Sequence, residues 1–154
     1  MWGLVTALVF LFFSEGPTLN PTENVRPGMT GSETTVVTRE ITVAHFHPEM
    51  PEVLGTPFMI YLMEVAASNA ISAALPAGRI SVGTEVNVKH LAATPVGRTV
   101  TATAEVTRVR DRLVTFAVEA HDGIERIGAG SHERAVIDLA RFERHIEAKR
   151  SVPD

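Results

Sequence analysis

The chain has 154 residues, of which 45% are hydrophobic and 21% are charged, and this composition suits one globular domain with a core rather than a disordered chain. The net charge of −4 argues against a nucleic-acid-binding surface, although a local basic patch could still hold a phosphorylated small molecule. The absence of cysteine excludes disulfides, thiolate metal sites and a cysteine nucleophile.

The chain begins with an uncharged apolar run at residues 2–13, WGLVTALVFLFF. A helix of that length would rise about 18 Å, short of the roughly 30 Å core of a bilayer, so no stable membrane insertion is expected. The run lacks the positive flank and cleavage site of a signal peptide. Three interpretations stay open: an extension upstream of the true start codon, a targeting or membrane-associated segment, and a packed helix. We assign residues 1–25 to this extension and a linker, residues 26–150 to the folded domain, and the protein to the cytoplasm.

The first half of the domain contains one predicted strand and one predicted helix. β-branched residues predict a strand at residues 33–42, and the proline-rich stretch 44–52 predicts an irregular loop. Thr56 is predicted to cap a helix, with Pro57 at its first position. Residues 58–75 are apolar on nearly every face, which indicates a helix buried in the centre of the domain.

The second half alternates between polar and apolar residues. This pattern predicts four antiparallel strands joined by short turns, at residues 84–91, 99–109, 113–121 and 124–137, with a closing amphipathic helix at 139–150. Gly128 and Gly130 predict a bulge or a close backbone approach in the last strand. A long apolar helix followed by such strands can be buried only if the sheet curls around it. The predicted class is therefore α+β with a hotdog fold, an antiparallel sheet wrapped around one long central helix. Its open sheet edge predicts a homodimer.

Three residues outside the turns stand out chemically. Glu64 is the single charged residue of the predicted central helix and has no basic partner one turn away. Burial of its carboxylate would be costly, which favours a functional role; the alternative is a solvent-facing stripe with Ser68 and Ser72. His90 shares a strand face with apolar residues, where its ring could meet Glu64, or could be an ordinary core histidine. Thr56 lies at the start of the same helix, either as a functional group or as a simple cap.

Metal chemistry is not predicted. The other five histidines, at positions 45, 47, 121, 132 and 145, are dispersed along the chain, and no HExxH motif occurs.

Several short segments occur in one order along the chain: TPFMIYLME at 56–64, VGT at 82–84, VKHLAATPVG at 88–97, AHDG at 120–123, IGAG at 127–130 and SHERAV at 131–136. Together they resemble the fluoroacetyl-CoA thioesterase-like family of hotdog thioesterases, over about residues 26–149. The resemblance implies catalytic roles for Thr56, Glu64 and His90, and an oxyanion contact from the backbone N–H of Gly83. It also implies a contact between Arg134 and CoA, which suits the planar guanidinium group.

The implied activity is hydrolysis of a small or medium acyl-CoA to the free acid and CoA, with no cofactor besides the thioester substrate. The phenylalanines that line the acyl pocket of the fluoroacetyl-selective enzyme are not matched, because the corresponding loop contains His47, Met50 and Pro51. Fluoroacetate is therefore not carried over as the substrate. Two alternatives stay open: a hotdog dehydratase or hydratase that pairs His45-Phe46 with the helix carboxylate, and a non-catalytic acyl-CoA-binding module.

Overall fold

The computed structural model describes residues 20–153, so the apolar run at 2–13 lies outside the described residues. In chain order the elements are β1 (Thr30–Val36), a 3-10 turn (Arg39–Ile41), α1 (Val43–Phe46), α2 (Thr56–Ile71), a second 3-10 turn (Ser72–Ala74), β2 (Arg79–His90), β3 (Thr99–Arg110), β4 (Leu113–His121), β5 (Arg126–Asp138) and α3 (Leu139–Arg150).

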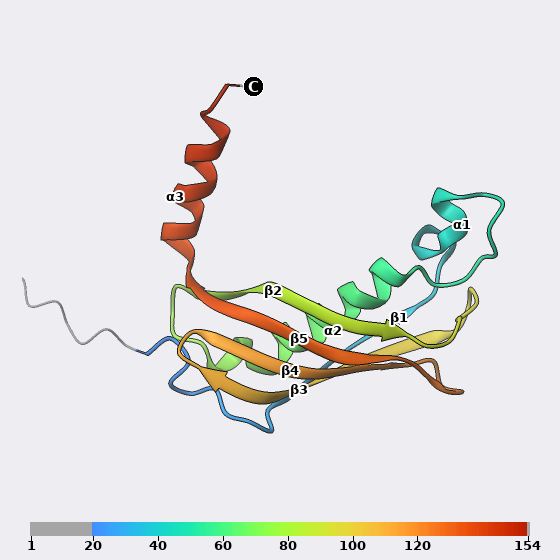
Figure 1. Cartoon of the computed structure of the whole chain (residues 1–154), viewed down its shortest axis with the longest axis horizontal. Coiled ribbons are helices and arrows are strands. Elements are labelled where there is room, and N and C mark those ends of the chain that lie inside the picture. The colour runs from blue at the N-terminus through green and yellow to red at the C-terminus, as the bar shows by residue number, and fades with distance from the viewer. Residues whose placement is uncertain (1–19, 154) are drawn as a thin grey trace, which may run out of the picture.

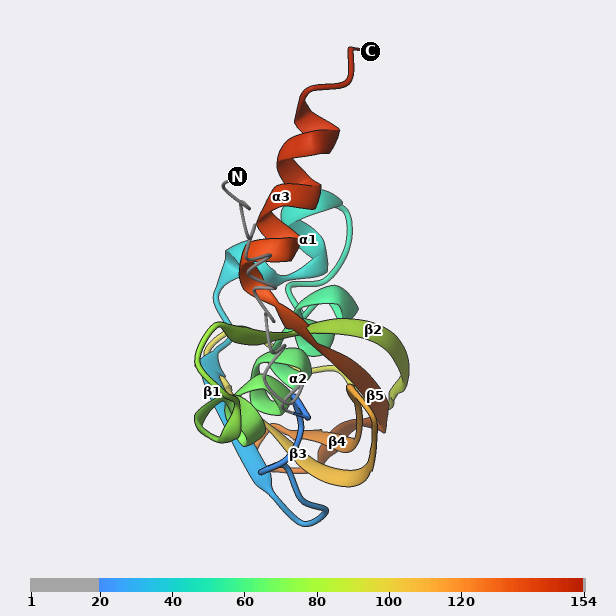
Figure 2. The same ribbon diagram turned by 90° about the vertical axis from the view of Figure 1, so that its left-hand side faces the viewer.

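The five strands form one antiparallel sheet in the order β1-β3-β4-β5-β2. The sheet curls around α2, which runs through its hollow (Figures 1 and 2). This arrangement confirms the predicted hotdog fold.

The core lies between α2 and the concave face of the sheet. Residues of β3 and β4 alternate between buried and exposed, as strands with one face on a core do. The helix contributes six buried residues: Met59, Leu62, Met63, Ala66, Ala67 and Ile71. Full burial of a large apolar side chain such as that of Phe116 stabilises the fold by about 1.5–3 kcal/mol. Val25 is also buried here, so packed structure reaches into the segment that we assigned to the linker.

Glycine permits a tight turn after β4 and the close approach predicted at Gly128. The turn at Asp122-Gly123 has Gly123 at φ 86°, and the Asp122 carboxylate accepts hydrogen bonds from the backbone N–H groups of Ile124 and Glu125. At Gly128 a Cβ atom would overlap the sulfur of Met59, so glycine lets the strand approach the helix there without displacing that side chain.

The region before α2 differs from the prediction in three ways. β1 ends at Val36, because Val37 turns into the core and is 1% exposed. The stretch predicted as irregular contains the short helix α1. Gly55, not Thr56, is the N-cap of α2, and Thr56 is its first helical residue. The Thr56 hydroxyl makes no capping bond because it is hydrogen-bonded across to β2 instead.

β2 is the last strand in the sheet order, and no strand within residues 20–153 pairs with its outer edge. Its middle, residues 83–87, is exposed throughout. α1 and α3 both project past this edge on the same side of the molecule, one at each end of it (Figure 1). Among the described residues, no helix is long and apolar enough to cross a membrane.

Candidate active site

The first polar pair joins the start of α2 to the end of β2. The hydroxyl of Thr56 lies 2.8 Å from Nδ1 of His90. Nε2 of His90 is buried and has no hydrogen-bond partner within residues 20–153. Burial lowers the pKa of His90, and the nearby Ala92 backbone offsets part of that shift. The ring is therefore neutral near pH 7, and it borders a cavity of about 360 Å³ that is otherwise lined mainly by small and apolar residues.

A second polar group lies further along α2. The Glu64 side chain is 37% exposed, and its Oε1 lies 3.9 Å from Nε2 of His132, which is 1% exposed. The carboxylate also rests directly against the backbone of Gly83 on β2, where a Cβ atom would overlap Oε1. Glycine at position 83 thus leaves room for the carboxylate beside an exposed strand edge.

His132 is held in one tautomer. Its Nδ1 lies 2.8 Å from the carbonyl oxygen of Glu85, which can only accept, so Nδ1 carries the hydrogen. Nε2 then accepts from the guanidinium of Arg134 at 3.3 Å. Burial lowers the pKa of His132, with a further lowering from Arg134, so the ring is neutral and its contact with Glu64 is not a hydrogen bond.

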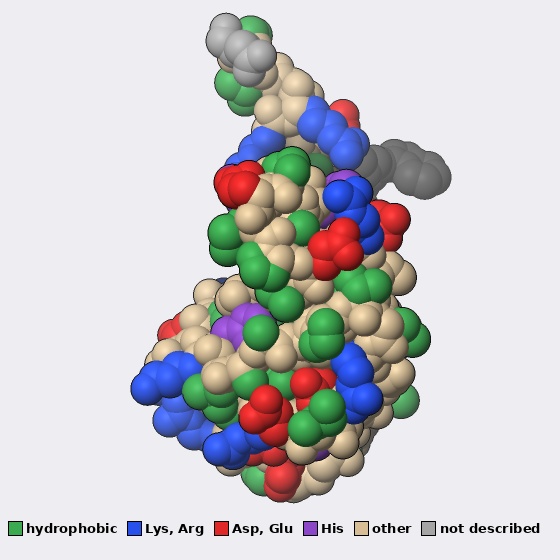
Figure 3. All heavy atoms as spheres, turned by 90° about the vertical axis from the view of Figure 1, so that its right-hand side faces the viewer, with side chains coloured by type: hydrophobic (Ala, Val, Ile, Leu, Met, Phe, Trp, Pro, Cys, Tyr) green, Lys and Arg blue, Asp and Glu red, His purple; other side chains and the backbone are tan. Residues whose placement is uncertain are grey.

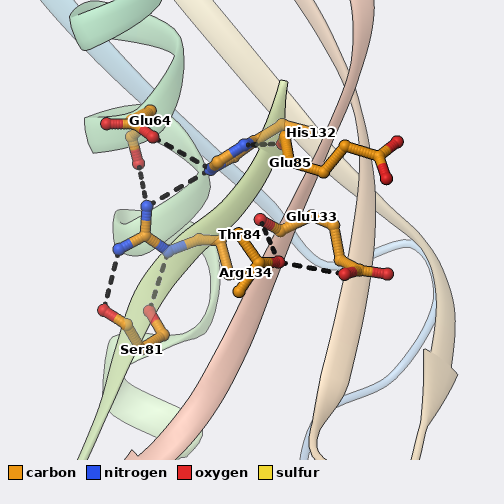
Figure 4. A network of polar contacts seen from close by, with 7 residues as sticks. All are labelled: Glu64, Ser81, Thr84, Glu85, His132, Glu133 and Arg134. Atoms are coloured by element: carbon orange, nitrogen blue, oxygen red, sulfur yellow. Dashed lines mark hydrogen bonds and ion pairs between the residues drawn. The ribbon is translucent and has the colours of Figure 1, made fainter. Parts of the chain in front are cut away.

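Arg134 is 8% exposed, and its guanidinium group donates hydrogen bonds to other residues of the same chain (Figure 4). Nε donates to Oγ of Ser81, and Nη2 donates to the Ser81 carbonyl oxygen. Nη1 donates to the Glu64 carbonyl oxygen and to His132. Four of the five guanidinium hydrogens are thus used to tie α2 to β2 and β5. A phosphate of CoA would have to displace these bonds.

The structure corrects the expectation that Glu64 meets His90 within one chain. Thr56 and Glu64 are eight residues apart on α2, which is about 12 Å along the helix axis. Their partners on β2, His90 and Gly83, are seven residues apart, or roughly 23 Å along the strand. The helix and the strand run side by side. Thr56 therefore lies beside His90 at one end, and Glu64 lies beside Gly83 further along.

His132 is the residue that sequence reasoning missed. It is one of several histidines dispersed along the sequence, yet it lies two residues before Arg134 in β5 and therefore on the same strand face. That spacing was the available signal. His45, by contrast, is exposed and packs edge-on against the ring of Phe46. The dehydratase alternative would require His45 to contact the Glu64 carboxylate. Within residues 20–153 His45 makes no hydrogen bond or ion pair with Glu64. The same residues contain no cluster of three metal-binding side chains.

The surface beside α1 is apolar and exposed. Phe46 is 64% exposed and stacks on Phe58 at a centroid distance of 6.2 Å, and Met50 in the following loop is 46% exposed. Figure 3 views this end of the molecule and shows hydrophobic side chains among charged ones over its projecting part.

Residues 37–140 match the family model described as fluoroacetyl-CoA-specific thioesterase. The fluoroacetyl-CoA thioesterase of Streptantibioticus cattleyicolor is 43% identical over 133 residues, which cover 82% of this chain and 96% of that relative. The chain belongs to the fluoroacetyl-CoA-specific thioesterase family. It is therefore a hotdog-fold thioesterase, as its sequence motifs predict.

Solved structures of the family agree with this assignment. The fluoroacetyl-CoA thioesterase FlK is 42% identical, with a TM-score of 0.75, over 83% of this chain and 98% of that one. A mutant of FlK in complex with acetyl-CoA is 43% identical, with a TM-score of 0.75, over 80% of this chain and 98% of that one. A thioesterase superfamily member from Thermus thermophilus is 27% identical with a TM-score of 0.78, covering 83% of this chain and 95% of that one.

Proposed function

We propose that the protein hydrolyses a small or medium acyl-CoA to the free acid and CoA, at a site built from two copies of the chain. The observation that carries this proposal is the division of the polar residues into two groups. The Thr56–His90 pair and the Glu64–Gly83 group each lie against β2, and neither is complete alone. Both groups lie between β2 and α2. One edge of β2 pairs with β5, and within residues 20–153 its other edge is free.

Pairing of two β2 edges in antiparallel fashion brings the groups together. In a two-fold arrangement that sets Gly83 of one copy opposite His90 of the other, the Glu64 carboxylate of the first copy comes beside the Thr56–His90 pair of the second. The arrangement repeats itself, so a homodimer would hold two such sites. It also covers the exposed middle of β2, which a long free strand edge requires for solubility.

The proposed chemistry adds water across the carbon–sulfur bond. The thioester carbonyl lies against the Gly83 backbone, where an N–H group stabilises the developing negative charge. Glu64 supplies the attack, as the nucleophile itself or as the base that takes a proton from water. The neutral His90 ring accepts the proton released by the attacking water and passes it to the departing sulfur, which returns the ring to its neutral form, and the Thr56 hydroxyl holds the ring in place. The carbonyl carbon gains the hydroxyl, and the sulfur gains the hydrogen.

The size of the acyl group is proposed from the cavity beside Thr56 and His90. Its volume of about 360 Å³ suits a small or medium chain. The residues in contact with the thioester supply acid–base chemistry by themselves, and the proposed reaction uses no metal or organic cofactor. Because its substrate is a CoA thioester, we also place the protein in the cytoplasm.

Arg134 has an indirect part in this proposal. The resemblance implies a contact with CoA, but the hydrogen bonds of Arg134 to Ser81, His132 and the Glu64 carbonyl oxygen suit a residue that positions Glu64. Contact of its one remaining N–H with the substrate stays part of the proposal.

The test is thiol release from a panel of acyl-CoAs that differ in chain length and polarity. Wild-type protein is expected to release CoA at enzymatic rates, and Glu64→Gln to reduce turnover by about 100-fold or more. Glu105→Gln, on an exposed position of β3, is the matched control and should retain full activity. A binding module would release no thiol in any variant. Water loss from a 3-hydroxyacyl thioester without thiol release would indicate a dehydratase instead.

A further inference from the structure

A second cavity, of about 430 Å³, lies at the other end of β2 from His90. It is enclosed by the start of β2, the turn between β3 and β4, the end of β5 and the first turns of α3, at the end of the molecule that Figure 2 views. Three arginines line it: Arg79, Arg112 and Arg141. His145 and the ring of Phe142 complete its wall.

The arginines of this cavity have no carboxylate paired with them in residues 20–153. None of the three makes an ion pair or a side-chain hydrogen bond within the described part of the chain. Among the described lining residues Asp138 alone is acidic, and its carboxylate caps α3 by accepting a hydrogen bond from the backbone N–H of Arg141. Such a cluster is a local exception in a chain whose net charge is −4. Mutually repelling guanidinium groups at one cavity are the usual setting for a phosphate ligand.

We propose that this cavity binds the 3′-phosphorylated adenosine diphosphate end of CoA. The inference rests on the proposed thioesterase function. Because Arg134 donates its hydrogen bonds within the protein, other cations must contact the phosphates of CoA, and the three arginines can do so. The arginines pair with the phosphates, and the Phe142 ring, which is 37% exposed, offers a surface on which adenine stacks.

The position of the cavity agrees with the reach of the substrate. Arg79 lies four residues before Gly83 on β2, which is roughly 13 Å along the strand and comparable to an extended pantetheine arm. In the proposed dimer, the register that sets Gly83 opposite His90 also brings the start of β2 beside residues 91–93 of the second copy. Those residues line the Thr56–His90 cavity. One thioester can therefore run from the acyl cavity of one copy to the basic cavity of the other.

The test compares an acyl-CoA with the acyl-pantetheine of the same acyl group, which lacks the nucleotide. In Arg79→Gln, Arg112→Gln and Arg141→Gln, the ratio of kcat/KM for acyl-CoA to that for acyl-pantetheine is expected to fall about tenfold each, mainly through KM. Arg126→Gln, which removes an exposed ion pair with Glu119, is the control and should leave the ratio at the wild-type value. An unchanged ratio in all three cluster variants would overturn the proposal.

A binding measurement separates this proposal from the proposed function. Adenosine 3′,5′-bisphosphate is expected to bind wild-type protein in calorimetry, and each cluster variant should bind it about tenfold more weakly. If the protein bound this nucleotide but cleaved no thioester, the thioesterase proposal would fail and the nucleotide site would stand. Inorganic phosphate that binds as tightly as the nucleotide would assign the arginines to free phosphate and refute a CoA site.

Discussion

The Thr56 hydroxyl and Nδ1 of His90 lie 2.8 Å apart, and this bond links the first turn of the central helix to the last residue of the edge strand. Thr56 is free to make it because Gly55 takes the N-cap position. The bond fixes the imidazole and leaves its buried Nε2 pointing away from any protein partner in residues 20–153. A neutral ring held in this way is suited to accept a proton and pass it on.

The acid limb of the pH–rate profile should report His90. Burial lowers the pKa of His90 below its usual 6.5, so the neutral ring persists to a lower pH than in a free histidine. We expect kcat/KM for an acyl-CoA to fall as the pH drops through that lowered pKa, with a midpoint below 6.5. In Thr56→Val, which keeps the shape but removes the hydroxyl, kcat should fall by about tenfold or more. His45→Ala is the control and should leave the profile unchanged; a profile that is flat below pH 6.5 in wild-type protein would exclude His90 as the proton carrier.

Gly83→Ala should impair catalysis through Glu64. The added methyl group would overlap Oε1 of Glu64 and lie 3.2 Å from Cε1 of His132, so the carboxylate must move. We expect kcat to fall by about 100-fold, with the fold retained. A double-mutant cycle gives the check: in the Glu64→Gln background, Gly83→Ala should cause little additional loss. Additive losses would mean that Gly83 acts independently of the carboxylate.

Arg134→Gln should destabilise the protein even without substrate. The substitution removes hydrogen bonds from a charged donor to Ser81, the Glu64 carbonyl oxygen and His132. We expect the free energy of unfolding in urea to fall by about 2–4 kcal/mol. For Arg126→Gln, at an exposed ion pair, the expected change is at most about 1 kcal/mol. A variant of unaltered stability whose KM alone rises would instead favour a direct contact between Arg134 and CoA.

Stability should fall in mild acid because of His132. Its ring is buried and neutral, and its pKa in the folded state lies below 6.5. As the pH falls below 6.5 the unfolded chain takes up a proton that the folded chain does not, so the free energy of unfolding decreases. The full stability is therefore present above pH 6.5 and is lost toward the lowered pKa. His132→Gln should reduce the slope of this dependence, leaving the part due to His90, when unfolding is measured by urea titration over about 2.5 pH units, from about pH 7.5 to about pH 5. An equally steep dependence in the variant would assign the effect to other groups.

The sequence predicts the fold well because its two halves have different patterns. The stretch after Thr56 is a long, almost uniformly apolar run with a proline at its start, as in a buried helix, and the strands from β3 onward alternate, so their bounds agree with the structure to within a few residues. The start of β2 was placed too late because residues 79–83 do not alternate cleanly, and the bulge between Gly83 and Glu85 interrupts the pattern.

The site was only partly accessible to sequence reasoning. Residue types and the helix position single out Thr56, Glu64 and His90. The sequence pattern does not, however, give the distance in space between a residue on the helix and a residue on a distant strand. The expectation that Glu64 meets His90 in one chain failed for that reason. The buried network of Arg134 and His132 depends on how β5 lies against α2, which appears only in three dimensions.

The most direct measurement mixes two inactive variants, Glu64→Gln and His90→Ala, after joint unfolding and refolding. In a composite site, a mixed dimer has one site that carries both substitutions and one that carries neither. Random pairing should therefore restore about a quarter of wild-type thiol release, because half of the dimers are mixed and each keeps one of its two sites. No recovery in a mixture that forms mixed dimers would contradict a thioesterase site shared between Glu64 of one copy and His90 of the other.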